Sequence, residues 1–115
     1  MTVTEPAIGE VRRSDGRVEL SFSVPESLLY LRGHFPGFAI LPGVVQVDWA
    51  IRYGRQYFGV GSAAATIVQV KFRKPIRPGR PFDLRLDYSG EQRRLSFEYG
   101  DEEGLYSSGR VVFDA

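Results

Sequence analysis

The chain has 115 residues, of which 43% are hydrophobic and 25% are charged, and these values are ordinary for a globular protein of one domain. We therefore expect a single domain over residues 1–115, and we do not expect a disordered or fibrous protein. The formal net charge of +1 argues against a general nucleic-acid-binding protein, whose affinity would come from an excess of Lys and Arg facing phosphates.

Cysteine is absent and His34 is the only histidine, so disulfides, thiolate metal sites and multi-histidine metal sites are excluded. The N-terminal residues lack the basic and apolar regions of a signal peptide. No later segment has the uninterrupted apolar length that spans a bilayer. The sequence therefore predicts a soluble, cytoplasmic protein without a bound metal.

The first half of the chain predicts a hairpin, a structured loop and a helix. Two alternating runs in residues 8–24 are separated by an Asp-Gly turn at 14–16, which is typical of a β-hairpin. Residues 33–43 contain too many Pro and Gly residues for a helix and are too apolar for an ordinary solvent loop. Residues 44–58 can then form a helix of about four turns. Apolar residues surround most of this helix, which indicates that it is buried.

The second half predicts strands in residues 66–72, 82–88, 95–99 and 106–113, where apolar and polar residues alternate. Short turns join the last three, which favours an antiparallel meander. The order of hairpin, helix and strands belongs to the α+β class. A curved antiparallel sheet wrapped around the central helix would bury that helix.

Two candidate functional groups lie in the loop and at the start of the helix. His34 is a candidate general base, because imidazole has an unperturbed pKa near 6.5; alternatively, its ring satisfies backbone groups in a tight loop. Gly43 would place helix N–H groups without intrahelical partners where a carbonyl oxygen gains negative charge. Alternatively, the Pro-Gly pair simply begins the helix.

Asp48 is the third candidate, on a largely apolar part of the helix. Partial desolvation would raise the pKa of its carboxyl group and suit it to general-acid catalysis. An i to i+4 salt bridge with Arg52 would instead hold Asp48 as an anion with a structural role, and the spacing leaves both interpretations open. A base, an acid and an oxyanion donor together suit removal of a proton alpha to a thioester carbonyl and loss of a beta-hydroxyl group, which is a dehydration.

These residues resemble the signature of the hot-dog-fold 3-hydroxyacyl-ACP dehydratases. That signature is His-Phe-Pro-Gly, followed by Pro-Gly-Val and then by Glu or Asp on the central helix. The corresponding residues here are His34-Phe35-Pro36-Gly37, Pro42-Gly43-Val44 and Asp48. Residues 70–80, VKFRKPIRPGR, also look like the family's strand and following turn. The sequence of residues 36–50, PGFAILPGVVQVDWA, is most similar to the subgroup found in aryl polyene gene clusters.

The resemblance implies a hot-dog fold and the conversion of a 3-hydroxyacyl thioester to a 2-enoyl thioester in fatty acid, polyketide or aryl polyene synthesis. It implies a homodimer in which the histidine of one subunit meets the acid of the other. It implies no cofactor apart from the phosphopantetheine arm of an acyl carrier protein that carries the substrate. The implied roles are base for His34, acid for Asp48, donor to the thioester carbonyl for Gly43, and walls of the acyl tunnel for Phe35, Trp49 and Tyr53. For Trp49 and Tyr53, core packing is the alternative.

Five basic residues and no acidic one lie between positions 71 and 80: Lys71, Arg73, Lys74, Arg77 and Arg80. If the resemblance holds, they form a rim that attracts the acidic carrier protein; the alternative is a solvated strand face. Two positions depart from the family pattern. Ala39 replaces a frequent proline, and Arg52 replaces a frequent glutamine. A tight pair between Arg52 and Asp48 would weaken the role of Asp48 as an acid.

Two other functions fit the same fold. A thioesterase would use the helix carboxylate to attack the thioester or to activate water, but the His-Phe-Pro-Gly loop favours dehydration. A non-catalytic acyl-binding subunit would keep the tunnel without turnover. The presence of both His34 and Asp48 argues against it.

Overall fold

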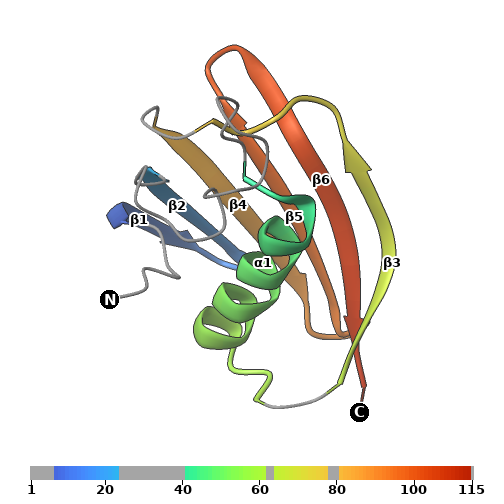
Figure 1. Cartoon of the computed structure of the whole chain (residues 1–115). Helices are drawn as coiled ribbons and strands as arrows, with labels where there is room; N and C mark the ends of the chain where they lie inside the picture. The colour runs from blue at the N-terminus through green and yellow to red at the C-terminus, as the bar shows by residue number, and fades with distance from the viewer. Residues whose placement is uncertain (1–6, 24–40, 62–63, 78–80, 115) are drawn as a thin grey trace, which may run out of the picture.

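The computed structural model describes residues 7–23, 41–61, 64–77 and 81–114. In these residues, one antiparallel sheet of six strands curves around one helix (Figure 1). The strand order is β1-β2-β4-β5-β6-β3. The elements are β1 (Ala7–Ser14), β2 (Arg17–Ser23), α1 (Gly43–Phe58), β3 (Ala65–Phe72), β4 (Phe82–Ser89), β5 (Arg94–Asp101) and β6 (Gly104–Phe113). The α+β class predicted from the sequence is confirmed.

The local turn signals are also confirmed. Strands β1 and β2 form the expected hairpin, in which Ser14 pairs with Arg17 around the Asp-Gly turn. Gly16 at this turn has a φ of 71°, a backbone conformation that glycine adopts at little cost. Strands β4, β5 and β6 pair in sequence as an antiparallel meander.

The core lies between one face of α1 and the concave face of the sheet. The helix contributes Trp49, Ala50 and Tyr53, which are 1%, 0% and 5% exposed and follow helical spacing. The sheet contributes alternate residues of β2, β4, β5 and β6, among them Leu20 and Phe97. The helix ends at Gly59, whose φ of 67° is left-handed and whose N–H donates to the carbonyl of Arg55. Within the described ranges, no helix is long and apolar enough to cross a membrane.

The prediction that the helix is buried around most of its circumference is confirmed, and the exception is one exposed stripe. Val44 is 77% exposed, and the side chains of Asp48 and Arg52 are 57% and 41% exposed. These residues are spaced by four, so they form one stripe along the helix. The stripe faces away from the sheet, and it leaves the predicted acid in solvent.

Strand β3 is present as expected, but its apolar residues are not buried. Ile67, Val68 and Phe72 are 52%, 59% and 55% exposed. Among the described strands, β3 lies at one edge of the sheet and pairs only with β6, so none of them covers its outer side. Exposed apolar residues on an unpaired edge are unusual, because such an edge invites pairing with another chain.

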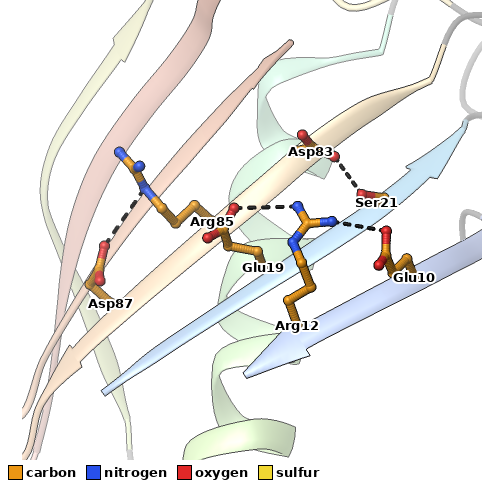
Figure 2. Close-up of polar contacts among 7 residues, drawn as sticks. All are labelled: Glu10, Arg12, Glu19, Ser21, Asp83, Arg85 and Asp87. Atoms are coloured by element: carbon orange, nitrogen blue, oxygen red, sulfur yellow. Dashed lines mark hydrogen bonds and ion pairs between the residues drawn. The ribbon is translucent and has the colours of Figure 1, made fainter. Parts of the chain in front are cut away.

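The face of the sheet opposite the helix carries polar side chains from β1, β2 and β4 (Figure 2). Arg12 lies between two carboxylates, with nitrogen to oxygen distances of 2.9 Å to Glu10 and 3.4 Å to Glu19. On the neighbouring strands, the Ser21 hydroxyl donates to Asp83 at 2.6 Å. Each exposed ion pair adds only about 0–1 kcal/mol to stability. Among these groups one guanidinium faces three carboxylates, so their net charge is negative.

Candidate active site

The first N–H groups of the helix start have no partner within the helix. Pro42 precedes the helix and provides no side-chain cap, while its carbonyl accepts from the N–H groups of Val45 and Gln46 at 3.1 and 3.2 Å. Within the described part of the chain, the N–H groups of Gly43 and Val44 have no hydrogen-bond partner. Since the helix dipole is positive at this end, these groups can stabilise an oxygen that gains negative charge.

The ring of Phe72 packs directly against Gly43. A Cβ atom built on Gly43 would lie only 2.6 Å from Cζ of Phe72, so any larger residue at position 43 would displace the ring. Phe72 pairs with Ser107 on β6, which is fully buried, and therefore faces the helix side of the sheet. Sequence reasoning missed this contact, because it depends on a pairing between β3 and β6 that no local pattern reveals.

Asp48 forms the salt bridge with Arg52 that the spacing allowed, with 2.9 Å between Oδ2 and Nη2. The expected desolvation of Asp48 is not found in the single chain, because both side chains lie on the exposed stripe. An exposed i to i+4 pair stabilises a helix by about 0.3–0.5 kcal/mol. This pair is therefore too weak to hold Asp48 against a competing group in an active site.

Gly43 and Asp48 lie within the first two turns of α1, about 7.5 Å apart along its axis at 1.5 Å per residue. The structure therefore brings two of the three predicted catalytic groups to one end of one helix. His34 and Phe35 lie outside the described residues. Their roles as base and tunnel wall stay predictions.

Trp49 and Tyr53 pack in the core of the single chain, where they are 1% and 5% exposed. This is the core-packing alternative that the sequence left open. Their role in lining an acyl tunnel stays a prediction.

Gln46 shares the buried helix face with Trp49, Ala50 and Tyr53, and it is only 3% exposed. It was not among the residues predicted from the sequence. Its position, three, four and seven residues before those apolar residues, would have marked it as a polar side chain inside the core.

The basic residues of the 71–80 segment do not form one surface. Lys71 pairs with Ser108 and lies on the face of the sheet opposite the helix. It lines a shallow trough of about 400 Å³ together with Arg73 and Arg110. Within the described ranges these three cations take part in no ion pair, so this half of the outer face is positive.

The other two described basic residues, Lys74 and Arg77, line a separate hollow of about 220 Å³ near Glu103. The ammonium group of Lys74 lies 5.4 Å from the centroid of the Tyr106 ring, within the range of a cation–π contact. Arg80 lies outside the described residues.

No group of three or more His, Cys, Asp and Glu side chains that could hold a metal ion is found in the part of the chain that the structure covers.

Comparison with known families gives one clear match. The family model described as "ApeI-like: ApeI dehydratase" matches residues 10–110. A curated relative from Erythrobacter litoralis, named 3-hydroxyacyl-[acyl-carrier-protein] dehydratase FabZ, is 34% identical over 76 residues, which cover 57% of this chain and 50% of that protein. The chain thus spans about half the length of the curated relatives it matches.

Solved structures confirm the fold over nearly the whole chain. A chain of the dehydratase heterocomplex ApeI:P from Xenorhabdus doucetiae is 27% identical, with a TM-score of 0.88 over 96% of this chain and 99% of that chain. An uncharacterized protein from Erwinia carotovora subsp. atroseptica is 32% identical, with a TM-score of 0.78 over 96% of both chains. The predicted hot-dog fold is confirmed.

Proposed function

Because the chain belongs to the ApeI-like dehydratase family, whose model matches residues 10–110, we propose that it removes water from a 3-hydroxyacyl thioester carried on an acyl carrier protein. The product is a 2-enoyl thioester, made for aryl polyene or related fatty acid or polyketide synthesis. The family match carries the proposal, because it spans all three candidate catalytic residues, His34, Gly43 and Asp48.

The proposed reaction assigns one task to each group. His34 removes a proton from C2, next to the thioester carbonyl. The N–H groups at the start of α1 stabilise the negative charge that develops on the carbonyl oxygen. Asp48 donates a proton to the C3 hydroxyl group, which leaves as water while the C2–C3 double bond forms. The chemistry requires no metal or redox cofactor, only the phosphopantetheine arm that carries the acyl group.

A homodimer is part of the proposal, and the apolar residues of the β3 edge support it. Ile67, Val68 and Phe72 lie on that edge, and Val44 stands beside them at the helix start as a further exposed apolar residue. A second copy that covers this region would exclude water from Gly43 and bring its own His34 towards Asp48. Light scattering of the purified chain is expected to give the mass of a dimer; a monomer at micromolar concentration would contradict this part.

Of the basic residues in the 71–80 segment, Lys74 and Arg77 are proposed to receive the acidic carrier protein, because they line one hollow. Electrostatic attraction would raise the rate of encounter and weaken at high salt.

The cytoplasmic location stays a prediction.

The proposal is tested by incubating the purified protein with 3-hydroxyacyl carrier proteins that bear short, long and aryl-containing chains. Mass spectrometry of the carrier species is expected to show the loss of one water. Substitutions His34→Ala and Asp48→Asn should each slow this loss by at least about a hundredfold, since each removes a general acid or base, while the mass of the assembled protein stays unchanged.

The other outcomes identify the alternatives. Free carrier protein would indicate a thioesterase. No change with any chain would indicate an acyl-binding subunit or a missing partner. Full activity in His34→Ala would overturn the mechanism.

A further inference from the structure

A buried polar cluster lies beneath the helix start, formed by Gln46 of α1, Tyr99 of β5 and Ser107 of β6. The three residues are 3%, 0% and 0% exposed. Nε2 of Gln46 donates to the carbonyl of Leu41 at 3.1 Å, and the Ser107 hydroxyl donates to Oε1 of Gln46 at 2.6 Å. The Tyr99 hydroxyl donates to the backbone carbonyl of Gln46 at 2.7 Å. The amide side chain of Gln46 therefore joins the sheet to the segment that precedes the helix.

Apolar side chains would fill this space at lower cost, because a buried amide must find partners for its polar atoms. What an apolar residue cannot do is hold a carbonyl in one orientation. Burial, with smaller effects of Tyr53 and Asp48, raises the pKa of Tyr99 well above its usual value. The Tyr99 hydroxyl therefore remains a hydrogen-bond donor throughout the physiological pH range.

Leu41 is held on both sides of its backbone. Its N–H donates to the carbonyl of Ile76 at 2.8 Å, and its carbonyl accepts from Gln46. Leu41 is 2% exposed and Ile76 is also 2% exposed, so water does not compete for these groups. These two hydrogen bonds, together with those that the Pro42 carbonyl accepts, restrain the Leu41–Pro42–Gly43 segment and the direction of the Gly43 N–H.

We infer that Gln46 is a positioning residue, which aims the Gly43 N–H at the substrate carbonyl by fixing Leu41 from inside the core. Ser107 acts through Gln46, because its hydroxyl holds the amide in the orientation that donates to Leu41. The inference rests on the proposed function for the role of Gly43. It adds two residues that contact no substrate.

The test compares four variants of the full chain. Gln46→Met keeps the length of the side chain and removes both of its hydrogen bonds, while Ser107→Ala removes one. The double variant Gln46→Met/Ser107→Ala also removes the Ser107 hydroxyl that Gln46→Met leaves without its acceptor, so only the Leu41 carbonyl loses its partner. Gln56→Met makes the same substitution at an exposed position near the end of the same helix and serves as the control.

Gln46→Met is expected to lower kcat by about 10- to 100-fold, the effect of a misplaced catalytic group, with KM changed by less than about threefold, because ground-state binding is not altered. The double variant should recover part of the melting temperature lost in Gln46→Met but keep the low kcat. Gln56→Met should match the wild type in both. A kcat that recovers together with the melting temperature would overturn the inference, because the cluster would then be only structural. Wild-type kcat in Gln46→Met would also overturn it.

A second readout does not need activity. Hydrogen exchange of the Leu41 amide is expected to be about five- to tenfold faster in Gln46→Met than in Gln56→Met, since loss of a buried hydrogen bond favours local opening. Equal exchange rates would overturn the inference even if the wild type has no dehydratase activity. Faster exchange in an inactive protein would support the role of Gln46 in fixing Leu41 and show that the proposed function is wrong.

Discussion

The pair of Asp48 and Arg52 decides whether the helix carboxylate is free to react. The spacing of four residues allowed a salt bridge, and the structure contains one, with both side chains more than a third exposed. Solvent screens such pairs, so the attraction is small compared with the several kcal/mol that a catalytic group contributes. The pair is therefore compatible with an acid that exchanges its arginine for a substrate hydroxyl.

Arg52→Gln tests whether the salt bridge with Arg52 is too weak to hinder Asp48. Because the pair is worth about 0.5 kcal/mol, its removal is expected to change kcat by no more than about twofold. The measurement is the steady-state rate of water loss, with light scattering as the control for assembly. A fall of more than about tenfold would give Arg52 a part in the reaction, whereas a rise of that size would mean that it restrains Asp48.

Among single residues, the sequence predicted those that lie close together in one motif. Gly43 and Asp48 lie where the Pro-Gly signal and the helix placed them. Gln46 could have been predicted as a buried polar residue, because helical spacing puts it on the buried face. Phe72 and Ser107 could not be found in this way, because their contacts join the helix to β3 and β6. Local patterns do not reveal which distant segments lie side by side.

Among the elements, β3 shows most clearly what periodicity reveals and what it does not. Alternation predicted the strand within one residue, from 66 instead of Ala65. It could not show that β3 lies beside β6 at the edge of the sheet, since strand order arises from long-range pairing. The edge position of β3 explains why Phe72 is half-exposed. Lys71 lies on the outer face of the sheet, whereas Lys74 and Arg77, which follow the strand, line a different hollow.

That separation gives a prediction for the carrier protein. The carbonyl of Ile76, which lies between Lys74 and Arg77, accepts a hydrogen bond from the N–H of Leu41 next to the helix start. A carrier bound to these two residues can therefore deliver its arm to Gly43. Lys74→Glu/Arg77→Glu is expected to raise KM for a carrier-bound substrate by about tenfold and to leave kcat unchanged with a small synthetic thioester.

The matched control is Lys71→Glu/Arg73→Glu, which makes the same change of charge on the outer face of the sheet. A carrier bound there would have to pass its arm around the edge of β3, so this variant should change KM by less than about threefold. The opposite ranking of the two variants would place the carrier on the outer face. Equal KM values for both and for the wild type would exclude the segment as a docking surface.

For the whole molecule, the single chain leaves two regions uncovered that the proposed homodimer would join in one site. The stripe of Val44, Asp48 and Arg52 faces solvent, and so does the apolar edge of β3. A second copy related by a two-fold axis would cover both regions on both chains at once. The desolvation of Asp48 expected from the sequence would then arise from the assembly and not from the fold of one subunit.

Mixing two inactive variants tests whether each site draws on both subunits. If His34 of one subunit serves Asp48 of the other, a mixed dimer of His34→Ala and Asp48→Asn subunits holds one intact site and one doubly deficient site. With equal amounts and free exchange, half of the dimers are mixed, so about a quarter of the wild-type activity should return. Exchange is driven by mild denaturation and refolding, and each variant treated alone is the control. If both groups came from the same subunit, every site would lack one of them, and the mixture would stay as inactive as its parts.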